Sequence, residues 1–344
     1  MTTLVTGASG FVGSHVARLL AERGEPVRVL LRPTSRTDGL EGMACERVTG
    51  DLCRPESLEA VLRGVRRVFH VAADYRLWSR DAAEIYSNNV EGTRNLLGAA
   101  RHAGVEQFVY TSTVATVAVP TEDGRLPDES TPASLEQMIG HYKRSKFIAE
   151  REVLAAAGDG MPVVIVNPTT PVGPGDWKPT PTGRIVVDFL NGRMPAYVET
   201  GLNVVGVEDV AAGHLLAAER GKVGERYILG GRNMTLQEIL TELAFITGRA
   251  APCVRIPHVM AMAAACVDTA FCRMLRREPH IPMDGVRMAR HRMFVETSKA
   301  ERELGFQAGP VAGALERAVR WYEGHGYVRG VGDKAPAVPE RRAA

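Results

Sequence analysis

The sequence has little of what several protein classes require. Only five of its 344 residues are cysteine, and no Cys-x-x-Cys pair occurs. A disulfide framework and a zinc site are therefore not expected, and we expect no metal in the active site. The net charge is only +2 at pH 7, and no Lys/Arg cluster carries interleaved aromatic residues, which excludes a typical nucleic-acid-binding surface. No charged and then apolar leader precedes the first expected strand, so we expect a cytoplasmic protein rather than a secreted one.

Alternating structural patterns fill the first half of the chain. With 45% hydrophobic and 24% charged residues, the composition is that of an ordinary globular protein. Short apolar strand patterns alternate with helical patterns, and this order predicts an α/β fold with a doubly wound parallel sheet of the Rossmann type. We expect strands at residues 4–6, 27–31, 46–48, 68–72, 108–111 and 163–166, and helices at residues 11–23, 82–103 and 141–156.

The first expected strand runs into glycines at every third position, namely Gly7, Gly10 and Gly13. Gly7 permits a tight turn, Gly10 lets the main chain approach a phosphate, and Gly13 lets the next helix pack close to the strand. A pyrophosphate would then sit on the N-terminus of that helix. A plain glycine-rich turn is the alternative for this motif taken alone.

The pattern changes after Asn167, where five prolines mark irregular loops. Loops beyond the strand ends of an open α/β sheet are where substrates bind. The expected division is residues 1–167 as a nucleotide-binding Rossmann domain with 202–232 returning to it, residues 168–201 and 233–330 as a smaller, mostly helical substrate lobe, and residues 331–344 as a flexible tail.

Tyr142 and Lys146 lie four residues apart in an expected helix, so both side chains lie on one helix face. A free tyrosine has a pKa of about 10, and a neighbouring ammonium together with an oxidised nicotinamide would lower it. The pair is therefore a candidate for acid–base catalysis, although exposed helices often carry such residues. The fifth expected strand ends in hydroxyl side chains at residues 110–113, and one of them could hydrogen-bond a substrate carbonyl.

The glycine loop, the hydroxyl-rich strand end and the Tyr142/Lys146 pair occur in the order that is typical of extended short-chain dehydrogenases/reductases. Nearly the whole chain resembles this family, which is also described as the NAD(P)-dependent epimerase/dehydratase family. The resemblance implies that Tyr142 is the general acid/base, and that Lys146 holds the nicotinamide ribose and lowers the tyrosine pKa. It also implies that Thr113 orients the reacting oxygen, with Ser112 in this role if the register shifts by one.

The cofactor-binding residues come from the glycine loop, from this resemblance and from the charge argument below. They are Gly7, Ser9, Gly10, Phe11, Val12, Gly13, Arg32, Ser35, Arg36, Asp51, Leu52, Ala72, Ala73, Asn89, Tyr142, Lys146, Pro168, Thr169 and Thr170.

The choice of cofactor depends on the end of the second expected strand. NAD-selective folds place an acidic residue there to accept the ribose hydroxyls. Here Leu31 stands at that place and is followed by Arg32, Ser35 and Arg36. A guanidinium with nearby hydroxyls suits a 2′-phosphate, so we expect NADP(H), with NAD and a plain solvated basic loop as the alternatives.

Three long stretches, at residues 70–78, 139–146 and 173–185, are similar to a subgroup described as hopanoid-associated sugar epimerases, in the dihydroflavonol-reductase-like branch. However, the arginine with which the family's nucleotide-sugar epimerases clamp a pyrophosphate is replaced by Gly-Leu-Asn at residues 201–203. The Asp-Glu pair of the family's sugar dehydratases is likewise replaced, by Val-Ala at residues 114–115.

These departures favour an NADP(H)-dependent oxidoreductase that reduces a carbonyl on a sugar-derived or hopanoid side-chain substrate in hopanoid lipid biosynthesis. A sugar epimerase with tightly bound NAD(P) and no net redox is the first alternative. A non-catalytic dinucleotide-sensing regulator is the second, although such proteins typically lose the tyrosine–lysine pair.

The resemblance and the composition also indicate which molecules the protein binds. We expect a small-molecule or lipid-linked sugar-derived substrate, no nucleic acid, and a homodimer through the helices at residues 82–103 and 141–156. The apolar residues 259–275 are too few to span a bilayer. They predict a buried helix of the smaller lobe, a helix that lies on a membrane surface, or a lid over a lipid substrate. Residues expected beside the substrate cleft are Tyr75, Arg76, Trp78, Trp177 and Lys178.

Overall fold

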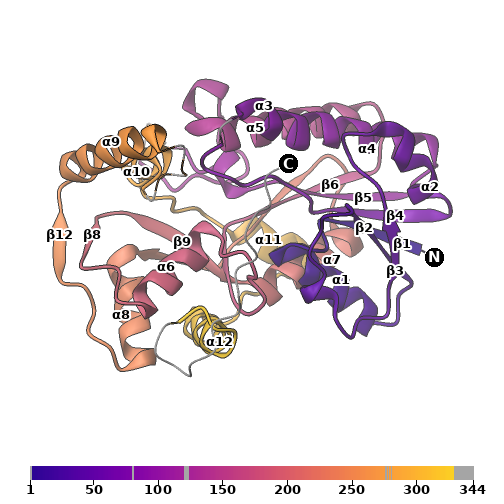
Figure 1. Ribbon diagram of the computed structural model, residues 1–344. Coiled ribbons are helices and arrows are strands. Elements are labelled where there is room, and N and C mark those ends of the chain that lie inside the picture. Colours follow the sequence, from indigo (N-terminus) through magenta and orange to yellow (C-terminus); the bar gives the residue numbers. More distant parts are fainter. Residues whose placement is uncertain are drawn as a thin grey trace.

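Seven parallel strands form the central sheet of the protein (Figure 1). The computed structural model describes residues 2–79, 81–119, 124–275, 277, 279 and 281–328, so the predicted tail at residues 331–344 lies outside the described residues. The strand order β3-β2-β1-β4-β5-β6-β10 reverses beside β1, which is the predicted doubly wound arrangement. The strands are β1 (Thr2–Thr6), β2 (Val27–Leu31), β3 (Glu46–Thr49), β4 (Val65–His70), β5 (Gln107–Thr111), β6 (Val163–Pro168) and β10 (Arg226–Leu229).

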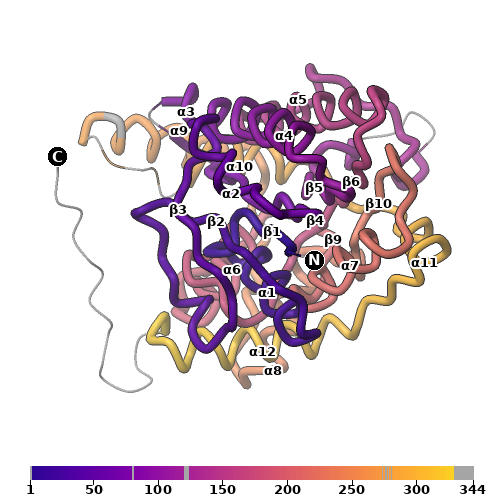
Figure 2. Tube along the Cα trace, turned by 90° about the vertical axis from the view of Figure 1, so that its right-hand side faces the viewer, coloured from indigo at the N-terminus to yellow at the C-terminus, as the bar shows by residue number. Residues whose placement is uncertain are grey.

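Helices cover both faces of this sheet, and Figure 2 shows α4 and α5 above the strands and α1 and α7 below them. Alternate strand residues supply the two cores, as Val5 and Val109 pack with α1 and α7 while Leu4 and Phe108 pack with α2, α4 and α5. Burial on both faces explains why the inner strands are almost wholly apolar. The helices are α1 (Phe11–Glu22), α7 (Val207–Arg220) and α11 (Ser298–Leu304) on one face, and α2 (Leu58–Leu62), α3 (Ala82–Tyr86), α4 (Gly92–His102) and α5 (Gly140–Gly158) on the other.

A smaller lobe with its own core lies beside the strand ends. It holds a three-stranded sheet in the order β11-β9-β7 and a two-stranded sheet of β12 and β8. A capping box of Thr235 and Glu238 begins α8 in this lobe. The elements are β7 (Thr170–Val172), β8 (Ala196–Val198), β9 (Gly201–Gly206), β11 (Arg232–Thr235), β12 (Val254–Ile256), α6 (Pro181–Leu190), α8 (Leu236–Thr247), α9 (His258–Met274), α10 (Met283–Met288) and α12 (Val311–Gly324).

Two segments cross the expected division between the lobes. Within residues 202–232, α7 and β10 join the central layers, whereas β9 pairs with β7 and β11 of the small sheet. The strand links the two cores, because Val204 packs in the core of the smaller lobe and Val205 in that of the larger. Conversely, α11 comes from the segment expected in the substrate lobe, yet Leu304 is buried in the core under the central sheet.

The helix expected at residues 82–103 is helical throughout but not uniform. A π-helical segment, Ser87–Glu91, separates α3 from α4. Such a widened turn changes the direction in which the next side chains point, and these segments are frequent at functional sites. Here Asn89 is 2% exposed and points into the protein.

The apolar stretch at residues 259–275 forms α9, but most of its apolar side chains are not buried. Ala261 and Ala265 are buried against the lobe with Met262 packed beside them, whereas Val267, Phe271 and Met274 are more than half exposed. The expectation of a buried helix is therefore wrong for this face. Within the described part of the chain, no helix combines the length and the apolarity needed to cross a bilayer.

The glycine loop between β1 and α1 is packed too closely for side chains. A Cβ on Gly7 would lie 2.6 Å from the Ala72 nitrogen, and Gly7 has a φ of +72°, which favours glycine. A Cβ on Gly13 would lie 2.2 Å from the Gly7 carbonyl oxygen. These contacts fix the turn that brings the N-terminus of α1 to the sheet.

Replacing Gly13 by alanine should lower the free energy of unfolding by about 1–3 kcal/mol, because the new methyl group must displace backbone atoms. Gly98→Ala is the matched control, since a Cβ at this helical position meets nothing within 4 Å. It should raise the free energy of unfolding by about 0.5–1 kcal/mol. Urea denaturation measures both changes, and equal effects of the two substitutions would contradict the packing argument.

Candidate active site

A cavity of about 840 Å³ lies at the carboxyl ends of the central strands. This volume falls within the range of ligand and cofactor sites. Its wall begins at the glycine loop, passes the ends of β4 and β5, and reaches α10 and the small sheet of the second lobe. The cavity therefore lies where a doubly wound sheet binds its ligands.

One end of the cavity fits a pyrophosphate. Gly7, Ser9 and Gly10 line it together with the first residues of α1. Gly10 precedes α1 and makes no side-chain cap hydrogen bond, so the first-turn N–H groups are available to a ligand. A Cβ on Gly10 would lie 3.2 Å from the Gly7 oxygen, so a side chain here would crowd the turn. The residues present therefore suit the phosphates of a dinucleotide.

The loop after β2 lines the same end. Arg32, Ser35 and Arg36 all face the cavity, as the sequence predicts. The Ser35 hydroxyl accepts a hydrogen bond from the Arg32 backbone N–H at 3.0 Å. Arg36 donates two hydrogen bonds to Asp38, at 2.9 and 3.1 Å, so its charge is already neutralised. Arg32 forms no ion pair with any described residue, which leaves its guanidinium for an anionic ligand.

Most other predicted cofactor residues also line the cavity. Asp51 accepts a hydrogen bond from the Cys53 backbone, and this turn places Leu52 against the cavity. The lining residues among the predictions are Gly7, Ser9, Gly10, Phe11, Val12, Gly13, Arg32, Ser35, Arg36, Asp51, Leu52, Ala72, Ala73, Tyr142, Pro168, Thr169 and Thr170, while Lys146 and Asn89 lie behind the wall.

Tyr142 and Thr113 meet at the cavity wall. Tyr142 is near the start of α5, and Thr113 lies two residues beyond the end of β5. Burial raises the pKa of Tyr142, and a hydrogen bond with the Thr113 side chain lowers it in part. The neighbouring Ser112 also lines the cavity, and its buried hydroxyl has no hydrogen-bond partner among the described residues. The structure thus brings a phenol and two alcohol groups to one place.

Lys146 is buried directly behind this pair. Its ammonium donates hydrogen bonds to the Tyr110 hydroxyl and to the Thr111 carbonyl, both at 2.8 Å. Burial lowers the pKa of Lys146 to about 7, against the opposing influence of Glu150. The Lys146 ammonium thus connects α5 to the end of β5. The contact between Lys146 and a nicotinamide ribose stays a prediction.

A second buried network holds the loop that carries Thr113. Asn167 donates hydrogen bonds from its amide to the Thr113 carbonyl at 3.1 Å and to Glu150 at 2.9 Å. Glu150 in turn accepts from the Thr116 hydroxyl at 2.9 Å and pairs with Arg226 at 3.1 Å. Polar groups buried in this way stay favourable only while every partner is present, so they fix one arrangement of β5, β6 and α5.

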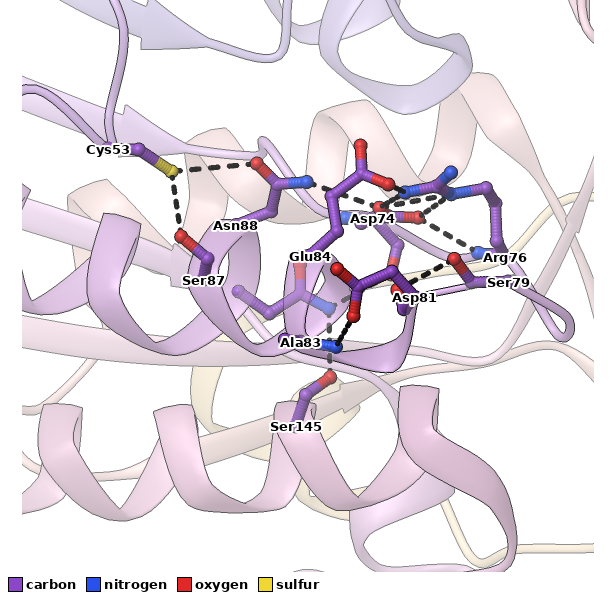
Figure 3. A network of polar contacts seen from close by, with 11 residues as sticks. Cys53, Asp74, Arg76, Ser79, Asp81, Ala83, Glu84, Ser87, Asn88 and Ser145 are labelled. Carbon is purple, nitrogen blue, oxygen red and sulfur yellow. Dashed lines mark hydrogen bonds and ion pairs between the residues drawn. The ribbon is translucent and has the colours of Figure 1, made fainter.

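Asn89 serves as a support rather than as a lining residue. Its side chain accepts a hydrogen bond from the Asp74 backbone N–H at 2.7 Å and donates one to the Ser145 hydroxyl at 2.9 Å. Figure 3 shows the surrounding network, in which Asp74 lies between Asn88 and Arg76. The π-helical segment therefore connects the loop after β4 to the helix that carries Tyr142.

Loops of both lobes line the rest of the cavity wall. Tyr75, Trp177 and Lys178 line the cavity as expected, and the Tyr75 hydroxyl donates to the Lys178 carbonyl at 3.2 Å. The Arg36 guanidinium lies over the Trp177 ring, 5.8 Å from its centroid, so Trp177 is on the side of the loop after β2. Arg76 lines it too, whereas the expected Trp78 is not part of the lining. Trp177 packs edge-on against Trp321, with ring centroids 5.0 Å apart. The aromatic groups thus anchor a loop and also offer an apolar surface to a ligand.

Sequence reasoning missed Lys143, which follows Tyr142 in α5. Lys143 lines the cavity although it is only 8% exposed, and its nearest recorded partner is the Met293 sulfur at 3.9 Å. Burial lowers its pKa to about 8. The only signal in the sequence was its place beside the predicted acid–base tyrosine, because contact with Met293 requires the folded chain.

Relatives of known description share this architecture along almost the whole chain. A "Putative dihydroflavonol 4-reductase" from Synechocystis sp. is 48% identical over 329 residues, which cover 94% of this chain and 95% of the relative. "Sterol demethylase protein B" from Methylococcus capsulatus is 36% identical over 330 residues, covering 95% and 100%. The crystal structure of gox2253 matches with a TM-score of 0.85 and 47% identity, covering 95% of this chain and 99% of that one.

The family model described as "NAD dependent epimerase/dehydratase family" matches residues 3–230. These residues include the glycine loop, the strand end with Thr113, and Tyr142 with Lys146. A nicotinamide dinucleotide is the cofactor of the family, and the cradle at Gly10 fits it. The chain therefore belongs to the NAD-dependent epimerase/dehydratase family of extended short-chain dehydrogenases/reductases, and it is an enzyme of that class.

Proposed function

We propose that the protein is an NADP(H)-dependent reductase whose substrate carbonyl sits on a sugar-derived or hopanoid-type side chain. The observation that carries this proposal is the meeting of Tyr142 and Thr113 on the wall of a cavity whose far end is a glycine cradle for phosphates. The reductase name of the Synechocystis relative and the sterol in the name of the Methylococcus relative support a carbonyl on an apolar skeleton.

Each site residue has one task in this proposal. NADPH supplies a hydride for the carbonyl carbon when it is bound. Tyr142 gives its phenolic proton to the carbonyl oxygen, and Thr113 holds that oxygen by a hydrogen bond. The product is an alcohol, and the phenolate regains its proton from solvent. Lys146 fixes α5 so that Tyr142 faces Thr113, and its positive form favours the phenolate.

Replacing Tyr142 by phenylalanine should reduce the rate of NADPH-dependent carbonyl reduction by about 10²- to 10⁴-fold, because the proton donor is lost. NADPH affinity should change little, since the phosphates and adenosine are held elsewhere. Tyr75→Phe is the matched control, as it removes another hydroxyl from the same cavity. Stopped-flow absorbance of NADPH and fluorescence titration measure the two quantities. Full activity of Tyr142→Phe would contradict the assigned role and would favour a regulator that only senses the dinucleotide.

The preference for NADP(H) rests on Arg32. It lines the cavity without an ion-pair partner among the described residues, beside the Ser35 hydroxyl. A 2′-phosphate would supply the missing anion, and a planar guanidinium suits its geometry. An exchangeable NADPH also suits net reduction, whereas an epimerase retains its NAD.

Arg32→Ala should weaken NADPH binding by about 10- to 100-fold, the expected effect of losing a hydrogen bond to a charged group. NADH binding should change little. Arg36→Ala should have the smaller effect on NADPH, because Asp38 already pairs with that guanidinium. Fluorescence titration of each variant with both cofactors tests this. Equal losses for NADPH and NADH, or tightly held NAD in the purified protein, would contradict net reduction with NADPH and favour epimerisation.

We further propose that the protein is cytoplasmic and touches a membrane through α9. The helix presents Val259, Met260, Val267, Phe271 and Met274 to solvent, each more than half exposed. An apolar face of this kind suits the boundary of a bilayer. Helix α9 packs on α10, which lines the cavity, so a lipid-linked substrate would enter close to this face. Figure 1 also shows α3, α4 and α5 as one layer, which supports the expected dimer contact through paired helices.

The double substitution Val267→Glu with Phe271→Glu should reduce sedimentation with anionic lipid vesicles by about 10-fold or more, since two charges would enter the interface. Reduction of a water-soluble aldehyde should be unchanged. Phe245→Glu is the matched control, because Phe245 is 86% exposed but belongs to α8. A wild-type protein that stays in the supernatant would contradict membrane contact. Dissociation of a dimer by the double substitution would assign the face to a second copy of the chain.

A further inference from the structure

Lys143 is a buried cation without an anionic partner in the cavity wall. It is 8% exposed, and its ammonium contacts only the Met293 sulfur, at 3.9 Å, among the described residues. Lys146, three residues later on the same helix, shows the contrast, because its ammonium has two oxygen partners at 2.8 Å. A thioether is a weak acceptor, so the three N–H donors of Lys143 are nearly unused.

The carboxylates that line the cavity form no ion pair with Lys143 among the described residues. Asp74 pairs with Arg76, and Asp176 accepts hydrogen bonds from Thr180 and Tyr322 through Oδ2, while its buried Oδ1 has no partner among the described residues. Burial alone accounts for the lowered pKa of Lys143, with no carboxylate acting against it. A buried charge that no group compensates is costly, and an anionic ligand beside Lys143 would offset that cost.

The position of Lys143 assigns it to the substrate rather than to the cofactor. Met293 is bridged to Leu202 of the small sheet, and both residues line the cavity. The glycine cradle and Arg32 instead follow β1 and β2 of the central sheet. The Lys143 ammonium contacts Met293, so it lies on the side of the cavity that the second lobe forms.

We propose that Lys143 binds a carboxylate of the substrate and so selects oxo acids over neutral carbonyl compounds. This proposal rests on the proposed reduction, and it adds the chemical class of the substrate. The carboxylate oxygen accepts a hydrogen bond from the Lys143 ammonium, and the carbonyl is thereby held between Tyr142 and the cofactor cradle. No bond to Lys143 forms or breaks.

The test uses NADPH-loaded protein with 2-, 3- and 4-formylbenzoate and with the methyl ester of each. The wild type should reduce at least one acid with a kcat/KM about 10- to 100-fold above that of its ester, the effect expected for one charged hydrogen bond. Lys143→Met should lose this preference through a higher KM for the acid, while kcat/KM for the ester stays within about threefold. Lys143→Arg should keep part of the preference, because the charge remains.

Binding is measured separately, by the thermal protection that benzoate and benzamide give to the loaded protein. Benzoate should raise the melting temperature of the wild type but not that of Lys143→Met. Benzamide should raise the melting temperature of either protein only slightly. Folding of Lys143→Met is checked by its free energy of unfolding. This free energy should be higher than that of the wild type, and the difference should be larger at pH 7 than at pH 10. At pH values below its lowered pKa the buried wild-type lysine is charged, which destabilises the folded protein, and this cost disappears as the pH rises and the lysine loses its proton.

The outcomes separate the two proposals. If aldehydes are reduced but acid and ester are treated alike, or Lys143→Met keeps the preference, the carboxylate assignment is overturned and the reductase stands. If no aldehyde is reduced but benzoate protects only proteins that retain Lys143 or Arg at this position, the anion site stands and the reductase proposal fails. A borohydride-trapped adduct on Lys143 would also overturn the assignment, since it would show a covalent role.

Discussion

A buried ammonium holds α5 against the central sheet. Lys146 donates to the Tyr110 hydroxyl and the Thr111 carbonyl, so the start of α5 cannot move away from the end of β5. Tyr142 lies one helical turn earlier on the same face and therefore meets Thr113, just beyond the strand. One turn further along the same face of α5, Glu150 accepts a hydrogen bond from Asn167 of β6, which also holds this loop through the Thr113 carbonyl. Preorganisation of this kind lets a hydrogen-bonding pair act without rearranging during the reaction.

In the proposed function, one end of the cavity binds the cofactor and the other end binds the substrate. The glycine cradle offers backbone N–H groups, and Arg32 offers a guanidinium that has no ion-pair partner among the described residues. Both suit the phosphate groups of a dinucleotide cofactor. The opposite end is built from loops and helices of a lobe with its own core. Loops on a rigid scaffold are the usual carriers of substrate choice. Lys143 lies on the side of the second lobe, and unlike Lys146 it has no oxygen partner among the described residues.

The sequence predicts best what local spacing determines. Three glycines three residues apart, a tyrosine and lysine four apart, and alternating apolar strands each fix their geometry within a few residues, and the sheet order and cavity agree with them. Other features depend on what packs against a segment. The apolar pattern of α9 does not reveal that Phe271 faces solvent, and nothing near Leu304 indicates that α11 returns to the central core. Asn89 fits a cofactor motif, yet a π-helical turn directs its amide to Asp74 and Ser145.

The central claim is that this site transfers hydride from NADPH to a substrate carbonyl that Tyr142 protonates. The most direct measurement is the fate of deuterium placed at C4 of NADPH, in each of its two positions separately, during turnover of benzaldehyde. We expect one deuterium on the carbinol carbon of the alcohol from one of the two labelled forms and none from the other. An alcohol without deuterium from either form, or no alcohol while the protein holds its dinucleotide unchanged, would contradict it.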